Sequence, residues 1–464
     1  MSPCRVPSAE RRASGARVYG GIGNLRIRIP RDVPTTGQPA TSCDWDVRIT
    51  QPGSRRIPTR GLTRYDAAVT RIRIEPAGPV NFDVAVPGSK SHTNRALVCA
   101  SLAEGESVLA GASDSDDTAR LVAVLAGIER LDADLVVRGG APPRAGDYFF
   151  GNAGTSLRFF TSLAALGRGR FTIDGDARMR ERPIGGLVDA LRDLGVDARC
   201  GGRPPVILDA RGIRGGRCTI RDDASSQFVS SILLAAPCAD GPVTIEARHV
   251  PSWPYVQMTL DTMEAFGVRV EREIAALRVP KGAYAARRIE IEPDAAAANY
   301  FHAAAAVTGG RATVRGYRRG AGEGRFLDIL ESMKGRGVDV DMNDCPDSVQ
   351  TLAVVALFAE GSTRIRNVKN LRVKETDRIA ALGAELRKLG ARVTEFEDGL
   401  EIAPGPLRPA EIETYNDHRM AMSFAVAALA VPGVEIRDPE CVSKSFPRFF
   451  DVLESQGVKV VRVP

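Results

Sequence analysis

The chain has 464 residues, of which 44% are hydrophobic, and this length exceeds what one ordinary hydrophobic core needs, so two domains are expected. Its formal charge of +6 is concentrated at one end: residues 1–70 hold 12 arginines and 5 acidic residues, or +7, whereas the other 394 residues hold 51 basic and 52 acidic side chains, or −1. The globular part is therefore nearly neutral, which argues against a nucleic-acid-binding protein.

The cysteines and the apolar segments exclude further classes. None of the eight cysteines forms a CxxC pair and the four histidines are scattered, so neither a zinc site nor a disulfide framework is expected. No apolar run reaches the length of a membrane span, and the N-terminus lacks the apolar segment of a secretory signal. We expect a cytoplasmic protein without a metal.

Residues 1–70 are rich in Arg, Gly and Pro and show no sustained periodicity. This pattern predicts a disordered basic N-terminal extension. A start codon assigned too far upstream is an equivalent explanation. A functional arm, an organelle-targeting segment and a nucleic-acid-binding terminus remain open alternatives, supported by charge alone.

From Thr70 onward one pattern recurs six times: a polar entry, an Ala-rich helix that is apolar nearly all round, a Gly turn and a β-branched strand. Such helices should be buried. They are predicted at 89–103, 151–166, 224–236, 293–307, 346–359 and 416–431. Amphipathic helices, most ending in Gly, alternate with them within 183–200, 256–270, 325–342, 378–396 and 448–463.

The repeat sets the domain organisation. Six βαβαββ-like units account for essentially all of the chain after residue 70, and three per domain is the simplest grouping. We expect one discontinuous domain from residues 71–87 plus 293–464, and a second domain from residues 88–292. The crossing is placed near Glu290–Pro293, where the fourth unit begins.

Polar residues collect at the entries of the buried helices. Each of five residues could simply cap its helix, namely Ser91, Asn152, Ser225, Asp347 and Asp417. Six buried helices with polar entries favour a common reason, because converging N-termini create a positive potential suited to small anions. Seven cations near these entries would add to it: Lys90, Arg95, Arg182, Lys374, Arg378, Arg419 and Lys444. Phosphates and carboxylates are the expected ligands.

Two familiar phosphate motifs are absent. GSKS at 88–91 lacks the glycines of a Walker A loop, and GAGEG at 320–324 lacks the third glycine of a dinucleotide fingerprint. KETDR at 374–378 would be ordinary on a solvated helix, but it follows a strand at the same end as the buried helix entries. Arg419 in the first turn of an apolar helix needs an anionic partner.

Nine segments together resemble the 5-enolpyruvylshikimate-3-phosphate synthase family of enolpyruvyl transferases in order and spacing. They are PGSKSHTNRA, GNAGTSLR, RMRERPIG, SSQF, PDAAAANYF, DSVQTLAVVALFA, NLRVKETDR, YNDHRMAM and SKSFP. The resemblance covers about residues 71–464. It implies a two-domain inside-out α/β barrel built from six βαβαββ-like repeats, three per domain, with the active site in the interdomain cleft. Phe159 departs from the family pattern, because some members have Pro after the preceding Arg.

The resemblance implies transfer of the enolpyruvyl group of phosphoenolpyruvate to the 5-hydroxyl of shikimate 3-phosphate, with release of phosphate and without a cofactor. By this resemblance, shikimate 3-phosphate would be bound by Lys90, Ser91, Arg95, Ser225, Ser226, Gln227, Ser252, Asp347, Asn370 and Lys374. Phosphoenolpyruvate would be bound by Lys90, Asn152, Gly154, Arg182, Gln227, Arg378, Arg419 and Lys444.

Three residues are expected to be catalytic by the same resemblance. Asp347 would be the base that takes the 5-hydroxyl proton and should stay ionised among the cations, whereas Glu375 would be the acid that protonates the methylene carbon and must keep its proton. Proton transfer could also involve Lys90 and Lys444. Gly154 borders the phosphoenolpyruvate pocket, where the inhibitor glyphosate is expected to compete.

Two alternatives remain. The UDP-N-acetylglucosamine enolpyruvyl transferase shares the fold, but it is expected to carry a reactive Cys in a Gly-rich loop, and neither Cys200 nor Cys218 lies in such a motif. A non-catalytic anion-binding homologue should lack Asp347 or Glu375, and both are present. The expected partners are the two small-molecule substrates, with no nucleic acid or membrane, and the expected state is a monomer.

Overall fold

The computed structural model describes residues 70–76, 78–220, 225–247 and 250–463. The predicted N-terminal extension lies outside the described residues. Among these residues, no helix combines the length and the apolar character that a membrane span requires.

Three four-stranded sheets surround a first hydrophobic core. Their strand orders are β14(Arg288–Glu290)-β3(Gly105–Ala110)-β5(Asp134–Gly139)-β4(Ile128–Leu131), β6(Gly146–Phe149)-β7(Arg168–Asp174)-β9(Val206–Arg211)-β8(Asp197–Arg199) and β10(Gly216–Ile220)-β11(Val243–Ala247)-β13(Ala276–Val279)-β12(Glu271–Arg272). In each sheet the first two strands are parallel and the other pairs are antiparallel. The three sheets therefore repeat one topology.

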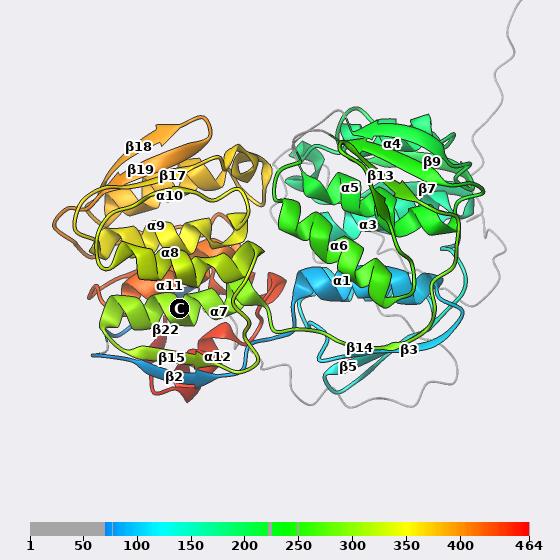
Figure 1. Ribbon diagram of the computed structural model, residues 1–464. Helices are drawn as coiled ribbons and strands as arrows, with labels where there is room; N and C mark the ends of the chain where they lie inside the picture. The colour runs from blue at the N-terminus through cyan, green and yellow to red at the C-terminus, as the bar shows by residue number, and fades with distance from the viewer. Residues whose placement is uncertain (1–69, 77, 221–224, 248–249, 464) are drawn as a thin grey trace, which may run out of the picture. The chain divides into compact units, whose positions relative to one another are not determined.

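The helices of this half alternate between buried and amphipathic types; those at 185–193 and 253–265 overlap predicted amphipathic segments, and the one at 116–124 was not predicted. The buried helices are α1(Lys90–Leu102), α3(Gly154–Ala165) and α5(Ser226–Ala235), and the others are α2(Asp116–Val124), α4(Gly185–Asp193) and α6(Trp253–Ala265). Short 3-10 turns lie at η1(Met179–Glu181) and η2(Ala236–Cys238). Helix α3 packs against α5, and α6 packs against both α5 and α1, and Figure 1 shows α6 between α5 and α1.

The second half repeats this topology in two sheets, β16(Asp339–Asp341)-β17(Thr363–Arg366)-β19(Gly399–Ala403)-β18(Arg392–Phe396) and β20(Glu411–Ile412)-β21(Glu435–Arg437)-β1(Arg71–Ile74)-β22(Val460–Val463). Its third sheet has only two strands among the described residues, β15(Arg311–Val314) and β2(Asn81–Val84), paired in parallel. The fourth predicted unit is therefore shorter than the other five.

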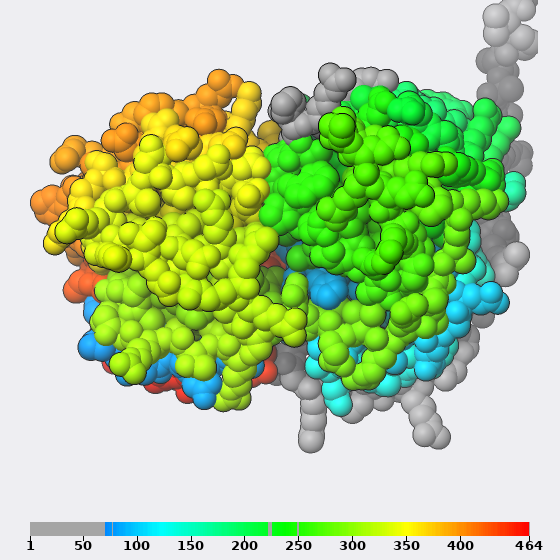
Figure 2. Space-filling view, viewed as in Figure 1, coloured from blue at the N-terminus to red at the C-terminus, as the bar shows by residue number. Residues whose placement is uncertain are grey.

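The helices of the second half are α7(Ala295–Thr308), α8(Phe326–Met333), α9(Val349–Val355), α10(Arg378–Lys388), α11(His418–Ala428) and α12(Phe449–Ser455). The 3-10 turns are η3(Gly322–Arg325), η4(Pro346–Ser348), η5(Ala356–Phe358), η6(Lys369–Val373) and η7(Pro439–Lys444). Helix α11 packs against α9 and α7, and Figure 1 shows these three helices stacked. In the space-filling view, side chains fill the gaps between the ribbons (Figure 2).

Two separate sets of buried side chains form the cores. One core runs from Ala96 to Ile291, and the other combines Ile72–Val84 with residues from Ala297 onward. The two crossings of the chain pair with each other, because Ser89 N donates to Glu292 O at 2.8 Å and Asp294 N donates to Pro87 O at 2.9 Å. The residues that make up each core therefore support two domains, one of residues 71–87 plus 293–464 and one of residues 88–292. This division stays a proposal.

The predicted helix caps are only partly right. Ser225 and Asp417 are N-caps whose side chains accept from the backbone N–H two residues later. Three predicted caps are wrong: α1 is capped by Ser89 in place of Ser91, α3 begins after Ala153 in place of Asn152, and Asp347 lies inside η4. The side chains of Ser91, Asn152 and Asp347 are therefore available for other contacts.

Candidate active site

The first turns of five buried helices line one small cavity of about 50 Å³. The entries are those of α1, α3, α5, α11 and the η4 turn that leads into α9. The lining residues predicted from sequence are Lys90, Ser91, Arg95, Gly154, Arg182, Ser226, Gln227, Ser252, Asp347, Lys374, Glu375, Arg378 and Arg419. Four predicted residues do not line it, namely Asn152, Ser225, Asn370 and Lys444, although each lies against a residue that does. The expected convergence of helix N-termini is therefore present for these five helices.

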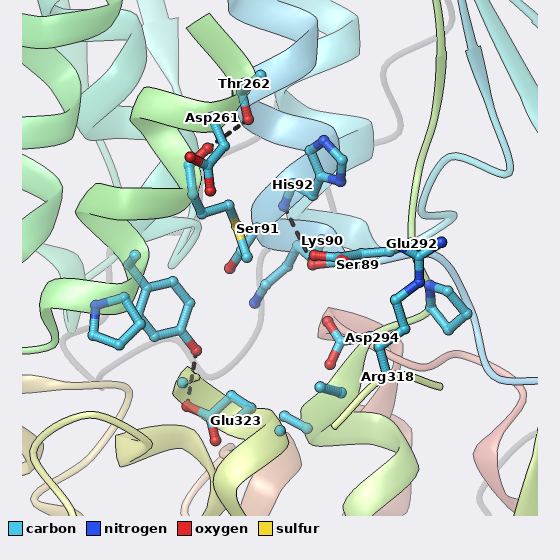
Figure 3. Close-up of a pocket in the computed structure, with 18 of the residues that line it drawn as sticks. Ser89, Lys90, Ser91, His92, Asp261, Thr262, Glu292, Asp294, Arg318 and Glu323 are labelled. Carbon is cyan, nitrogen blue, oxygen red and sulfur yellow. Dashed lines mark hydrogen bonds between the residues drawn. The ribbon is translucent and has the colours of Figure 1, made fainter. Parts of the chain in front are cut away.

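A larger cavity of about 570 Å³ adjoins the first and shares lining residues with it, including Lys90, Tyr255 and Asp347. The first turn of the sixth buried helix, α7, lines this larger cavity. Figure 3 shows Lys90 pointing into it from α1, and Glu323 facing it from η3. Together the two cavities give one continuous set of polar lining residues.

Asp347 lies between two guanidinium groups. Its Oδ2 accepts from Arg419 Nη2 at 2.7 Å and from the Tyr255 hydroxyl at 3.1 Å, and its Oδ1 accepts from Arg378 Nη1 at 3.4 Å. Burial would raise the pKa of this carboxyl, but the charges of Arg419 and Arg378 hold it well below its usual range. Asp347 is ionised, as the sequence predicts.

Arg378 joins three carboxylates at the start of α10. It forms a bidentate pair with Asp417 at 2.7 and 3.1 Å, and its Nη2 lies 2.9 Å from Glu375 Oε2. The guanidinium is 1% exposed, so leaving it without these partners would be costly. Asp417 also accepts from the backbone N–H of Arg419 at 2.9 Å, and it thereby fixes both arginines relative to Asp347.

The predicted protonation state of Glu375 is wrong for the free protein. Burial raises its pKa, but Arg378, Arg182 and Lys444 together lower it well below its ordinary value. Arg182 Nη1 lies 4.0 Å and Lys444 Nζ 3.9 Å from Glu375 Oε1. Three cations from three different elements therefore keep this carboxyl ionised, and only anionic neighbours could offset them.

Two lysines share one carboxylate at the other side of the small cavity. Lys90 Nζ lies 3.0 Å from Asp117 Oδ2, and Lys444 Nζ lies 2.8 Å from Asp117 Oδ1. Lys444 also donates to the Asn152 carbonyl at 2.7 Å. Asp117, at the first turn of α2, thus holds together two cations that are 27 and 327 residues away in the sequence.

Arg182 lies against the backbone of Gly154. Its Nη1 donates to Asn152 Oδ1 at 2.9 Å, and its guanidinium is 3% exposed. A Cβ added at Gly154 would lie 2.7 Å from Arg182 Nη2, closer than atoms normally approach. An alanine at this position would therefore require the guanidinium to move.

Arg95 is buried, and its hydrogen-bond partners among the described residues include no carboxylate. Its guanidinium donates to Thr259 Oγ1, to the Ser91 and Tyr255 carbonyls and to Ser230 Oγ, all of them uncharged. Burial lowers its pKa to about 10, which still leaves it charged at neutral pH. The ring of Phe159, the residue that departs from the family pattern, packs 5.2 Å beneath this group.

The predicted phosphate ligands surround Ser252, which caps α6 with a left-handed backbone at φ 57°. Its backbone N–H donates to Asn343 Oδ1 at 2.9 Å, and its hydroxyl accepts from Asn370 at 3.2 Å. Nearby, Gln227 donates to Thr155 Oγ1 at 2.9 Å. Lys374 is half-buried, and its desolvation lowers its pKa to about 8.

Several lining residues were not predicted from the sequence: Asp117, Thr155, Tyr255, Pro346 and His418 in the small cavity, and Glu323 in the larger one. Tyr255 lies three residues after Ser252, so an aromatic group next to a predicted ligand was the only available signal. Burial lowers the pKa of His418 well below its ordinary value, and this imidazole is neutral. Among the described residues, no group of three or more His, Cys, Asp or Glu side chains could hold a metal ion.

Comparisons with known proteins find relatives that share one enzyme name over most of the chain. The 3-phosphoshikimate 1-carboxyvinyltransferase of Shewanella amazonensis is 43% identical over 418 residues, covering 82% of this chain and 97% of that protein. The enzyme of the same name from a Marinomonas species is 41% identical over 419 residues, covering 83% of this chain and 99% of that protein.

Solved structures show the same fold. The EPSP synthase of Acinetobacter baumannii superimposes with a TM-score of 0.72 at 24% identity, covering 84% of this chain and 99% of that one. The enolpyruvyl transferase NikO of Streptomyces tendae gives a TM-score of 0.66 at 18% identity, covering 85% and 99%. At such identities the likeness shows the two-domain α/β fold alone.

The family model of EPSP synthase (3-phosphoshikimate 1-carboxyvinyltransferase) matches residues 74–453, which include the whole first core, most of the second and every lining residue of the small cavity. With this match and relatives above 40% identity over nearly their whole length, the chain belongs to the EPSP synthase family.

Proposed function

We infer that this chain transfers the enolpyruvyl group of phosphoenolpyruvate to the 5-hydroxyl of shikimate 3-phosphate and releases phosphate, a step of the shikimate pathway. One observation carries the inference from the structure. Among the described residues, six cations and three carboxylates line the small cavity, a surplus of +3, at the N-termini of several helices. Two substrates that each bear a phosphate and a carboxylate would supply the missing negative charge.

The binding roles follow the two sides of the cavity. Shikimate 3-phosphate would place its phosphate at Lys374 with Ser225, Ser226, Ser252 and Asn370, and its carboxylate at Arg95, while Gln227 lies along its ring and Ser91 assists. The buried Arg95 supports this role, because its hydrogen-bond partners are uncharged. Phosphoenolpyruvate would lie among Lys90, Arg182, Arg378, Arg419 and Lys444, bordered by Asn152 and Gly154.

The chemistry assigns opposite tasks to two carboxyl groups. Asp347, ionised between Arg378 and Arg419, would take the proton of the 5-hydroxyl as that oxygen attacks the enol carbon. Glu375 would deliver a proton to the methylene carbon. Because Glu375 is ionised in the free protein, it must gain that proton when the two anionic substrates offset Arg378, Arg182 and Lys444. Lys90 and Lys444 would stabilise the departing phosphate.

A coupled phosphate-release assay tests this function. Shikimate 3-phosphate and phosphoenolpyruvate together should release phosphate, and either alone should not. UDP-N-acetylglucosamine as acceptor should give none, because Cys200 and Cys218, the cysteines considered for that activity, line neither cavity. Turnover of that acceptor at a comparable rate would contradict the assignment, and binding of both acids without phosphate release would indicate a non-catalytic homologue.

We further propose that the protein acts as a monomer in the cytoplasm, without a metal or organic cofactor. The scattered cysteines support a reducing compartment, and the lining residues alone supply the charges that the reaction needs. Sedimentation at several protein concentrations would test the monomeric state, since a chain that dimerises would sediment faster as its concentration rises.

A further inference from the structure

A second buried carboxyl lies beside Asp347 and has no role in the reaction described above. Glu323, in η3, is 9% exposed. Its Oε1 accepts from the Tyr255 hydroxyl at 3.0 Å and from the backbone N–H of Asp347 at 3.1 Å, and its Oε2 accepts from Ser348 Oγ at 2.5 Å. Figure 3 shows Glu323 at the edge of the larger cavity, with the bond to the tyrosine hydroxyl as a dashed line.

The neighbours of Glu323 fix where the hydrogens lie. Asn299 donates from Nδ2 to Ser348 Oγ at 2.8 Å and to the Glu323 carbonyl at 2.9 Å. Because Ser348 Oγ accepts from Asn299, its own single hydrogen is free to point at Glu323 Oε2. Glu323 is therefore held in place from α7 and η4, and its remaining contact is with Tyr255.

The Tyr255 hydroxyl contacts two carboxylates with one hydrogen. It lies 3.0 Å from Glu323 Oε1 and 3.1 Å from Asp347 Oδ2. If both carboxyls are ionised, one of the two contacts brings oxygen against oxygen without a hydrogen. If one carboxyl holds a proton, both contacts become hydrogen bonds. Tyr255, Glu323 and Asp347 can therefore form both hydrogen bonds only when one of the two carboxyls holds an additional proton.

Resting on the proposed function, we propose that Glu323 is a positioning residue for Asp347: its carboxylate, acting through the Tyr255 hydroxyl, stabilises Asp347 once that residue holds the proton of the attacking hydroxyl. In this step the O–H bond of the 5-hydroxyl breaks and an O–H bond forms on Asp347 Oδ2. Asp347 then donates to the Tyr255 oxygen, and Tyr255 keeps its own hydrogen and donates it to Glu323, which stays a carboxylate.

The charge of Glu323 also offsets the two arginines. Arg378 and Arg419 make Asp347 a weak base, and a nearby negative charge raises the affinity of a carboxylate for a proton. Burial and the charge of Asp347 raise the pKa of Glu323 to about 7. At lower pH Glu323 is protonated and donates to Tyr255. Tyr255 then donates to Asp347, which makes Asp347 a still weaker base. The rate of proton abstraction should therefore rise with pH through about 7.

The titratable and charged groups around Glu323 come from every element packed on η3. They are Tyr255 on α6, Asp294 at the N-cap of α7, Tyr317 after β15, Cys345 and Asp347 near η4, Arg419 on α11 and Arg325 on η3 itself, while α8 turns apolar residues inward. Desolvation raises the pKa of Tyr255 well above its usual value, and that of Tyr317 to about 12. Neither tyrosine hydroxyl therefore titrates near pH 7.

A merely structural role makes a different prediction. Glu323 accepts from Asp347 N and Ser348 Oγ at the turn that leads into α9, so it could serve only to hold that turn. The variant Glu323→Gln separates the two roles, because it removes the charge but keeps the size and an oxygen that can accept. A turn-holding residue tolerates this change, whereas a residue that acts through its charge does not.

The experiment measures single-turnover rates of phosphate release between pH 6 and 9 with both substrates saturating. We expect the wild-type rate to rise through about pH 7 and the Glu323→Gln rate to lack this rise. At pH 8.5 the variant should be about tenfold slower, the effect expected when the pKa of the base falls by about one unit. The KM values should stay within about threefold of wild type, because Glu323 binds neither substrate. Tyr255→Phe, which breaks the relay and leaves the charge of Glu323 in place, should reduce this rise.

Glu385→Gln is the matched control. Glu385 is fully buried and also accepts from a tyrosine hydroxyl and a backbone N–H, those of Tyr415 at 2.7 Å and Glu413 at 3.1 Å, but it lines neither cavity. Its variant should keep the wild-type pH profile. A Glu323→Gln protein with the wild-type rate and profile would overturn the inference, and if that variant does not fold, a wild-type profile in Tyr255→Phe would overturn it. A wild type that releases no phosphate would instead refute the proposed function.

Discussion

Replacing Gly154 by alanine tests the geometry of the phosphoenolpyruvate side. The added Cβ would lie 2.7 Å from Arg182 Nη2 and 2.9 Å from its Cζ and Nη1. Ordinary contact begins at 3.4 Å, so the guanidinium must move by the difference between 2.7 and 3.4 Å, or 0.7 Å. It cannot do so freely, because Asn152 and Glu375 lie within 2.9 and 4.0 Å of Arg182 Nη1.

The expected cost follows from the bond that Arg182 would make to phosphoenolpyruvate. A hydrogen bond to a charged group contributes about 1.5–3 kcal/mol, and each 1.4 kcal/mol corresponds to about tenfold in affinity. If the displaced guanidinium loses one such bond, KM for phosphoenolpyruvate should rise about 10- to 100-fold in Gly154→Ala. The dissociation constant of shikimate 3-phosphate should change little, because Arg182 is not among its predicted ligands.

Steady-state phosphate release at varied phosphoenolpyruvate and saturating shikimate 3-phosphate measures this effect. Gly282→Ala is the control, because a Cβ at Gly282 meets nothing within 4 Å, and its KM should match wild type. A KM within twofold of wild type for Gly154→Ala would refute the placement of phosphoenolpyruvate beside Arg182.

Four further predictions follow from the site and the comparisons. Asp347→Asn should abolish turnover and leave shikimate 3-phosphate binding measurable by calorimetry, and a parallel loss of binding and turnover would indicate a structural Asp. Lys374 has a pKa lowered to about 8 by desolvation, so it loses its charge above that pH; the dissociation constant of shikimate 3-phosphate should therefore rise up to about tenfold between pH 8 and 9, and Lys374→Arg should flatten this rise. Glyphosate should raise the apparent KM for phosphoenolpyruvate without lowering the maximal rate, and turnover unaffected by saturating glyphosate at low phosphoenolpyruvate would disprove competition. Deletion of residues 1–69 should leave kcat and the melting temperature unchanged, since the family match begins at residue 74, and a large loss of activity would give the extension a function.

The repeat and the type of each helix could be predicted because they depend on local pattern. The buried helices are apolar all round, and their strands follow at a regular period, so α1, α3, α5, α9 and α11 lie within predicted segments and α7 extends one residue beyond its own. The reduced sheet of β2 and β15 could not be predicted, because one strand precedes the other by more than 220 residues. Helix starts were predicted where the side chain itself caps, as at Ser225, and failed where another serine, Ser89, stood two residues earlier.

The sequence predicts many of the charged residues of the candidate site, but not which of them contact one another. Cations at helix entries are visible in the sequence, so Lys90, Arg378 and Arg419 could be named without coordinates. Asp117 could not be named, because its two lysine partners come from distant segments. The state of Glu375 failed for the same reason, since it depends on three cations that only the fold brings together.

The central claim is that the N-termini of buried helices and their cations form one site for two small acids. The most direct measurement is a crystal structure of Asp347→Asn with shikimate 3-phosphate and phosphoenolpyruvate. We expect the shikimate phosphate at Lys374 and Ser252, and phosphoenolpyruvate between Arg182 and Arg378, each within hydrogen-bond distance. The claim would be contradicted if both acids, at saturating concentrations, bound elsewhere and these cations contacted neither of them.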